Sequence, residues 1–480
     1  MKKQAVNPFL PSYEYIPDAE PYVFDDRIYI YGSHDRFDGD DFCLNHYICY
    51  SAPTDDPGNW RFEGTIYKKE QDPFNEDGSQ NLFAPDVQKG LDGRYYLFYC
   101  LHRSPSVSVA VCDTPAGAYE FYGHIKYSDG TLYGHKLPQS VFNFDPGVLL
   151  DDDGRIYLYT GISHNQGMVR TMMEQAGYQL DGAYCVELNQ DMLTLKGEPK
   201  LVVPGEVKAA GTEYETHGFF EASSPRKIGD TYYFVYSSVK SHDLCYAVSS
   251  KPDEGYRYGG VIISIGDIGL VDEKDAVNYL SNTHGGIVKI KDKWYVFYHR
   301  HTNCHRNSRQ TCAEQIEILA DGHIPQVEVT SCGLNNSPLS GTGEYDAYIA
   351  CNLSGEEGTF PYKQEKDIDH KHPYFTQSGQ DREENGDQYI KNMHNGTWAA
   401  YKYFTFSEEK EITVWVRGNE EGILDISASK AGEPITQIHI TPSKEWHSFT
   451  AKFQAPKGTS ALYFKYKGKG TLDFKKFKIQ

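Results

Sequence analysis

A repeated hairpin pattern constrains the fold of this chain more than any other feature. A glycine or aspartate turn followed by a short aromatic strand recurs five times before residue 302, in FDDRIYIYG, GLDGRYYLFYC, DDDGRIYLYTG, KIGDTYYFVYS and KIKDKWYVFYH. The aligned tyrosines lie 61 to 76 residues apart, at Tyr29, Tyr96, Tyr157, Tyr233 and Tyr295. Each interval has room for four strands and their loops. The repeat therefore predicts an all-β fold, with a five-bladed β-propeller over residues 1–322.

The repeat stops after about residue 322, and the pattern of the remaining chain is different. A linker-like stretch is followed by segments that alternate polar and apolar positions, such as EKEITVWVRG, WHSFTAKFQ and ALYFKYKG. Alternation of this kind is typical of strands with one buried face. We therefore expect residues 323–480 to form a linker and a second domain, a β-sandwich of the jelly-roll type.

The composition excludes several classes of partner. The chain has 47 Lys and Arg against 67 Asp and Glu, a formal net charge of −20, which repels nucleic acid and anionic membrane surfaces. The N-terminal residues contain no apolar run of signal-peptide length, and no segment is long and apolar enough to span a membrane. We expect a cytoplasmic protein with no nucleic-acid or membrane partner. The 10 cysteines show no metal-finger spacing, which suits buried thiols.

Ionisable residues recur at one position of the repeat. Ten to twelve residues before the aligned tyrosines stand Asp18, Asp86, Asp145, Glu221 and His284. In a propeller this position lies on the innermost strand of each blade, so these side chains would converge around the central axis. Burying ionisable groups on apolar strands is costly unless each has a partner or a task.

Two interpretations of this ring of acids remain open from the residues alone. Cleavage of a glycosidic bond needs one carboxylic acid to protonate the leaving oxygen and one carboxylate to attack or to activate water. Repulsion and burial should raise the pKa of at least one member and keep it protonated. Alternatively, the acids only pair with neighbouring cationic side chains or backbone donors.

At these residues the chain resembles glycoside hydrolase family 43. The resemblance lies in the runs PDAEPYV, APDV, FDPGVLLDDDGRIYL, EASSPRKIGDTYYFVYS and HGGIVKIKDKWYVFYHR, in the family's order over residues 7–322. It implies a five-bladed propeller and an inverting enzyme that acts on arabinose- or xylose-containing saccharides. By the same resemblance, Asp18 is the general base, Glu221 the general acid, and Asp145 the residue that tunes the acid. An inverting mechanism predicts that the base and the acid stand roughly 6.5 to 9.5 Å apart.

The resemblance also suggests further site residues. It implies that His284 lies near the axis with a calcium ion or a water cluster, whereas a neutral histidine bonded to backbone is the alternative. Arg300 matches an arginine that reaches substrate hydroxyls, and Phe83 matches an aromatic wall of the sugar pocket. We expect Asp86 to brace its loop. No organic cofactor is expected.

Residues from about 370 to 480 resemble carbohydrate-binding module family 6, in DQYIKNMHNGTWAAYKYF and ALYFKYKGKGTLDFKKFKI. That family sandwiches a sugar between a tyrosine and a tryptophan. Here Trp446 matches the family's structural tryptophan, and the ligand tryptophan is missing. Tyr389 and Trp398 are expected to pack inside the sandwich. We therefore consider a scaffolding role at least as well supported as sugar binding.

The resemblance favours removal of terminal α-L-arabinofuranosyl units from arabinoxylan-derived saccharides. β-Xylosidase activity is the alternative, because the same three carboxyl residues serve both reactions. A polymer-cleaving endo-arabinanase ranks third, since it needs an open groove. A catalytically inactive sugar-binding propeller is a possibility from a different class, but Asp18, Asp145 and Glu221 are all retained.

Overall fold

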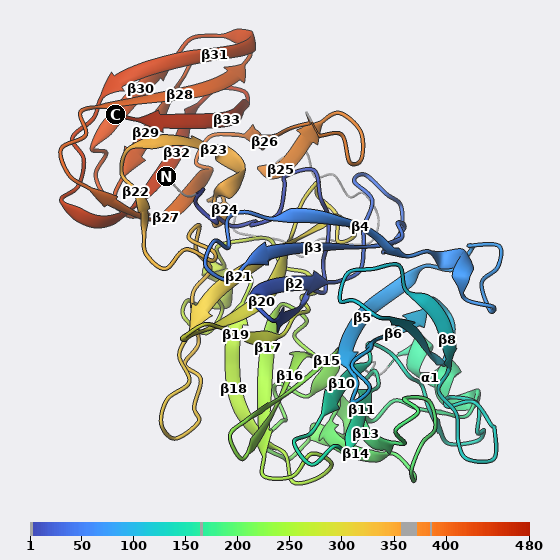
Figure 1. Cartoon of the computed structure of the whole chain (residues 1–480). Helices are drawn as coiled ribbons and strands as arrows, with labels where there is room; N and C mark the ends of the chain where they lie inside the picture. Colours follow the sequence, from blue (N-terminus) through green and yellow to red (C-terminus); the bar gives the residue numbers. More distant parts are fainter. Residues whose placement is uncertain (1–2, 164–166, 357–371, 385) are drawn as a thin grey trace.

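The regular secondary structure of the described residues is almost entirely β-strand, as the repeat predicts. The computed structural model describes residues 3–163, 167–356, 372–384 and 386–480. Within these ranges the α-helices are α1 (Met168–Gln175) and the short α2 (Glu206–Ala209), and no helix has the length and apolarity that a membrane span needs. The expected all-β class is confirmed (Figure 1).

Five antiparallel sheets occupy residues 20–316, and we call this part the five-sheet region. The first two sheets are β1 (Glu20–Phe24), β2 (Arg27–Tyr31), β3 (Tyr47–Pro53) and β4 (Arg61–Tyr67), then β5 (Leu82–Lys89), β6 (Tyr95–Leu101), β7 (Val107–Cys112) and β8 (Glu120–His124). The third is β10 (Gly147–Leu150), β11 (Ile156–Thr160), β13 (Gly182–Leu188) and β14 (Lys200–Pro204). The fourth is β15 (Phe219–Ile228), β16 (Thr231–Ser238), β17 (Asp243–Ser249) and β18 (Arg257–Ser264), and the fifth is β19 (Ile287–Ile290), β20 (Lys293–His301) and β21 (Arg309–Ile316). A short parallel pair, β9 (Ser140–Val141) and β12 (Tyr178–Gln179), lies outside these five sheets. β12 belongs to the segment that connects β11 to β13.

The repeated hairpin is the first pair of strands in each sheet. The five aligned tyrosines all lie on second strands, β2, β6, β11, β16 and β20, each paired with the first strand of its own sheet. Residues before or at the start of the first strands therefore occupy equivalent places in all five sheets.

Apolar clusters join the five sheets in a closed cycle. Separate buried clusters lie between β2 and β6, between β6 and β11, between β11 and β16, and between β16 and β20. The fifth cluster combines Ile28 and Ile30 of β2 with Tyr295 and Phe297 of β20, so the last sheet packs on the first. Alternating side chains of each aromatic strand serve the two neighbouring clusters, which explains why these strands are apolar on both faces.

A buried polar network ties the first strands together at the centre of this cycle. Arg226 on β15 donates to Glu20 on β1 at 2.7 Å and to the Ile287 carbonyl on β19 at 3.0 Å. Its guanidinium lies 4.7 Å from the Tyr22 ring, and the Tyr22 hydroxyl donates to Asp86 on β5 at 2.5 Å. The other Asp86 oxygen accepts from a backbone N–H of β10 at 2.6 Å. One network thus reaches all five sheets.

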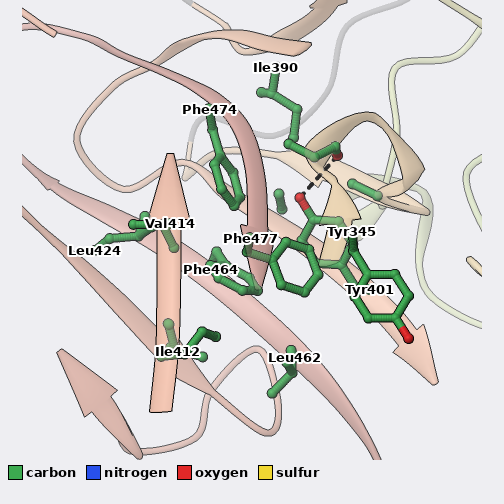
Figure 2. Close-up of a cluster of buried hydrophobic side chains, with 14 of the residues drawn as sticks. Tyr345, Ile390, Tyr401, Ile412, Val414, Leu424, Leu462, Phe464, Phe474 and Phe477 are labelled. Carbon is green, nitrogen blue, oxygen red and sulfur yellow. Dashed lines mark hydrogen bonds between the residues drawn. The ribbon is translucent and has the colours of Figure 1, made fainter. Parts of the chain in front are cut away.

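Two six-stranded sheets follow, and we call this part the two-sheet region. One contains β22 (Leu339–Ser340), β24 (Asn352–Ser354), β27 (Trp398–Phe406), β29 (Gly422–Ser427), β30 (Thr436–Ile440) and β32 (Gly458–Gly468). The other contains β23 (Gly343–Asp346), β25 (Tyr374–Ser378), β26 (Asp387–Met393), β28 (Glu411–Gly418), β31 (Ser443–Lys452) and β33 (Leu472–Ile479). Figure 2 shows their shared core, where Phe464 of the first sheet meets Phe474 and Phe477 of the second.

The two expected aromatic core residues of this region lie elsewhere. On β27, Ala399 and Tyr401 face the shared core, whereas Trp398 and Ala400 join a cluster of the fourth and fifth sheets. Successive residues of a strand point to opposite faces, so Trp398 packs between the two regions. Tyr389 packs edge-on against Trp446, with ring centroids 5.2 Å apart, outside the shared core cluster. The expectation for these two residues is therefore wrong.

Replacing Phe477 with Ala should destabilise the two-sheet region. Phe477 is fully buried, and its ring lies 4.7 Å from that of Tyr401 and 5.0 Å from that of Phe464. Loss of a buried phenyl group costs about 3 to 5 kcal/mol, because a cavity remains. Chemical denaturation should show this loss, whereas Leu91→Ala, at a side chain 65% exposed, should change the free energy of unfolding by less than about 0.5 kcal/mol. Equal effects of the two changes would contradict the assigned core.

Candidate active site

One cavity of about 800 Å³ opens where the first strands begin. Asp18, Asp145, Glu221 and His284 all line it. The sequence therefore identified four residues from four different sheets that the fold brings into one hollow. Aromatic side chains form much of the remaining wall: Phe42, Phe83, Phe142, Phe144 and Phe220.

The backbone at the three acids has an unusual conformation. Asp18 and Asp145 have positive φ angles of 56° and 45°, and Ala222, directly after Glu221, has a φ of 76°. The pairing of β15 with β16 shifts register on both sides of Glu221. Side-chain-bearing residues rarely adopt this left-handed region, and such strain is concentrated at functional sites. This backbone conformation directs the carboxyl groups of Asp18, Asp145 and Glu221 away from the regular strands and into the cavity.

Glycines next to the site residues allow the first strands to approach closely. A Cβ atom on Gly147, two residues after Asp145, would lie 2.3 Å from the Ser223 carbonyl oxygen of β15. A Cβ atom on Gly286, two residues after His284, would lie 2.4 Å from the Ser224 hydroxyl oxygen. The glycines in FDPG and THGG are therefore needed for packing at the centre.

Asp18 is held by an arginine as an ion pair. Arg309 Nη1 donates to Asp18 Oδ1 at 2.9 Å, and its Nε and Nη2 donate to the two oxygens of Asp35 at 2.8 and 2.9 Å. The bidentate Asp35 pair fixes the plane of the guanidinium. The Arg309 guanidinium thus places a positive charge directly beside the Asp18 carboxyl group.

His299 supports the same residue from the backbone side. Its Nδ1 accepts from the Asp18 N–H at 3.3 Å, and its Nε2 lies 3.0 Å from the Asn282 carbonyl oxygen, so the ring is neutral with the proton on Nε2. Burial lowers the pKa of His299, and the nearby Arg309 lowers it further. Because the His299 ring is neutral, the positive charge that pairs with the Asp18 carboxyl group comes from Arg309.

Glu221 has the opposite electrostatic environment. Withdrawal from water and the negative charge of Asp145 raise the pKa of Glu221 to about 8, although His284 opposes the shift. Glu221 is therefore protonated at neutral pH and can donate a proton. Burial also raises the pKa of Asp145, while the bond from His284 counteracts that shift.

His284 lies between the acids and the central network. Its Nδ1 is 3.5 Å from Asp145 Oδ2 and 3.9 Å from Asp18 Oδ1, while its Nε2 is 3.9 Å from Glu20 Oε1. Burial disfavours the imidazolium, but the three carboxylates together outweigh burial and raise the pKa of His284 to about 9. The charged ring thus offsets part of the negative charge of the acid cluster.

The structure brings Phe83 to the cavity but not Arg300. Phe83 lines the wall, with its ring edge-on to His102 at 5.3 Å. Arg300 instead donates to the carbonyl oxygens of Tyr348 and Ala350 at 2.6 and 3.2 Å, and its guanidinium lies 3.9 Å from the Phe375 ring. The assignment of Arg300 to substrate binding is therefore corrected: its hydrogen bonds hold the two-sheet region. Asp86 acts in the central network, as expected for a structural acid.

Residues 7–324 match the model for glycosyl hydrolases family 43, which is about two thirds of the chain. The chain belongs to glycoside hydrolase family 43. A xylosidase/arabinosidase of Thermoclostridium stercorarium is 50% identical over 486 residues, which cover 100% of this chain and 99% of that protein.

Solved structures of family 43 proteins share the fold. An arabinoxylan arabinofuranohydrolase from Bacillus subtilis in complex with cellotetraose is 18% identical, with a TM-score of 0.51 over 100% of this chain and 99% of that one. A β-xylosidase/α-arabinofuranosidase from a compost microbial metagenome, in complex with xylotriose and in a calcium-free form, is 26% identical with a TM-score of 0.51. That match covers 66% of this chain and 97% of the other.

The residues around His284 do not fit a calcium ion held by this family 43 chain. Calcium prefers six to eight oxygen ligands. Within the described ranges no group of three or more His, Cys, Asp or Glu side chains has metal-binding geometry. The Glu20 carboxylate, 3.9 Å from His284 Nε2, already pairs with the Arg226 guanidinium, whose charge would repel a cation.

Sequence inspection missed the cationic part of this family 43 site. Arg309, His299 and Asp35 organise Asp18, and Arg306 lines the cavity with its guanidinium 5.2 Å from the Phe42 ring. None of these residues stands at the repeat position that contains the acids. Arg306 and Arg309 follow the fifth aromatic strand in HRNSRQ. Their location at the end of the repeat was the only sequence signal that could have identified them as site residues.

The family 43 enzyme should lose activity as pH rises past about 8. The protonated form of Glu221 is present below its raised pKa and is lost above it, so the alkaline limb of kcat/KM should lie near pH 8. Glu221→Gln, which cannot release a proton, should lower kcat roughly 100- to 10,000-fold on an oligosaccharide and less on a substrate with a good leaving group. Near-full activity of Glu221→Gln on the oligosaccharide would contradict the role of acid.

Proposed function

We propose that this family 43 enzyme is an inverting glycosidase that removes terminal α-L-arabinofuranosyl residues from arabinoxylan-derived saccharides. The observation that carries the proposal is the contrast between two carboxyl groups in one cavity. Asp18 is paired with a guanidinium at 2.9 Å, whereas the pKa of Glu221 is raised to about 8. A base and an acid are thus available at the same pH.

In the proposed reaction, Asp18 takes a proton from a water molecule as that water attacks the anomeric carbon. Glu221 donates its proton to the departing glycosidic oxygen, and the C–O bond breaks with inversion at carbon. Asp145 keeps the pKa of Glu221 raised through its negative charge, and His284 limits the repulsion between the carboxylates. The products are the free sugar and the shortened saccharide.

We assign the aromatic wall and one arginine to the sugar. Phe83 and Phe144 both line the cavity, and aromatic rings suit the apolar faces of sugars. Arg306 is half-buried in the wall, and its Nε has no hydrogen-bond partner among the described residues. We propose that Arg306, rather than Arg300, holds substrate hydroxyl groups.

The proposal includes the architecture expected from the repeat. We propose that residues 1–322, which include the five-sheet region, form a five-bladed propeller and that residues 323–480 are a linker and a sandwich related to carbohydrate-binding module family 6. The cyclic order of the apolar clusters and the single core of the two-sheet region support this assignment.

β-Xylosidase activity is the second candidate. The relative that is 50% identical has a name that covers both activities, and the compost enzyme is a β-xylosidase/α-arabinofuranosidase with xylotriose bound. A non-catalytic sugar-binding protein is disfavoured because the acid and the base both line the cavity.

Hydrolysis of 4-nitrophenyl α-L-arabinofuranoside should exceed hydrolysis of 4-nitrophenyl β-D-xyloside. Asp18→Ala should reduce either activity roughly 100-fold or more, because the attacking water loses its base. A preference for the xyloside would favour the second candidate. No hydrolysis of either compound or of arabinoxylan oligosaccharides would contradict the proposed function.

The first product formed should have the inverted anomeric configuration. Proton NMR of a reaction started with the wild-type enzyme resolves the anomers before they interconvert. A retained configuration would mean that a carboxylate attacks carbon directly, and the roles of Asp18 and water would be wrong.

A further inference from the structure

The hairpin β25–β26 of the two-sheet region contacts three segments that carry active-site residues. Figure 1 shows these strands between the rest of the two-sheet region and the blue loops of the first sheet. Each contact is a hydrogen bond from one region to the other. The contacts are therefore specific in geometry, unlike the apolar packing around Trp398.

The first contact fixes the segment that leads to the base. Tyr15 is three residues before Asp18, and its buried hydroxyl donates to Gln377 Oε1 of β25 at 2.8 Å. The second contact involves the loop that carries Arg306. The Asn303 N–H donates to the Phe375 carbonyl of β25 at 2.7 Å, and the Thr376 hydroxyl donates to Asn303 Oδ1 at 3.0 Å.

The third contact is made by Asp381, in the turn between β25 and β26. Asp381 Oδ1 accepts from the Phe37 N–H at 2.6 Å, and its Oδ2 accepts from Asn45 Nδ2 at 3.1 Å. One carboxylate thus holds both ends of the loop 37–45. Asn45 also donates to the Asp35 carbonyl at 2.9 Å.

The loop 37–45 connects Asp381 to the reacting groups. Its Phe42 lines the cavity, and the Arg309 guanidinium lies 4.8 Å from the Phe42 ring. The Cys43 N–H in the same loop donates to Asp35 Oδ1 at 3.0 Å, the oxygen that also accepts from Arg309 Nη2. Displacing the loop would therefore move Asp35, then Arg309, and then the carboxylate of Asp18.

We propose that Asp381 is a positioning residue for the catalytic base, acting through the loop 37–45 and the Asp35–Arg309 pair. The two-sheet region then completes the active site of the five-sheet region without contacting the sugar itself. This proposal rests on the proposed function, since it takes Asp18 as the base.

Asp381→Ala should lower kcat/KM roughly 10- to 100-fold, mainly through kcat, because a small displacement of a positioned group has a large effect on rate. Asp381→Asn keeps an oxygen for the Phe37 N–H but places an amide against Asn45, so its activity should lie between those of Ala and wild type. The matched control is Asp387→Ala in the same hairpin, where Asp387 pairs with Lys475 inside the two-sheet region at 2.9 Å. This control should retain wild-type kcat/KM.

Hydrogen exchange of the full-length variants tests the same proposal without activity. The amides of residues 37–43 should exchange faster in Asp381→Ala than in wild type or Asp387→Ala. Unchanged exchange, activity within twofold of wild type, or an equal loss in the control would overturn the proposal. If Asp381→Ala does not fold, the same criteria apply to Asp381→Asn. Absence of glycosidase activity in the wild type would contradict the proposed function, while the exchange experiment would still decide whether Asp381 holds the loop.

Discussion

The buried ion pair of Glu20 and Arg226 is the interaction on which the rest of the molecule depends. Arg226 donates to β1 and β19 from β15, and through Tyr22 and Asp86 the network extends to β5 and β10. Removing one partner of a buried ion pair is strongly unfavourable, because it leaves an unpaired charge in the interior. The geometry of the five first strands is therefore tightly specified at their centre. Because the acids stand at the starts of these strands, the same network determines where the acids meet.

The active site gives two similar carboxyl side chains, Asp18 and Glu221, different electrostatic environments. Asp18 and Glu221 share a cavity, but Asp18 pairs with an arginine, whereas desolvation and the charge of Asp145 raise the pKa of Glu221. His284 lies between the cavity acids and the central network: its Nδ1 faces Asp145 and its Nε2 faces Glu20. The sign and location of neighbouring charges, more than the identity of the carboxyl groups, assign the roles of base and acid.

The two-sheet region is integrated with the rest of the chain. Trp398 completes an apolar cluster of the fourth and fifth sheets, and Arg300 donates to two carbonyl oxygens near the start of the two-sheet region. Hydrogen bonds from β25 and the following turn reach the loops beside the cavity. These contacts give the region a physical role that does not require a sugar site of its own.

The sequence by itself determined the repeated hairpins, the all-β class, and the cavity location of Asp18, Asp145, Glu221 and His284. It could do so because equivalent positions in repeated units share one environment, and strand periodicity is local. It failed at Arg300 and Trp398 because adjacent residues on a strand face opposite sides. On β20, His299 contacts Asp18, whereas Arg300 faces the two-sheet region.

Only the tertiary structure decided which cation serves Asp18 and which segments hold it. Arg309 and Asp18 are 291 residues apart, and Asp381 and Phe37 are 344 residues apart. No local pattern encodes such pairs, because their geometry depends on how the sheets close into a cycle and how the two regions dock. The sequence supplied the reactive groups, and long-range packing determined their charge states and their orientation.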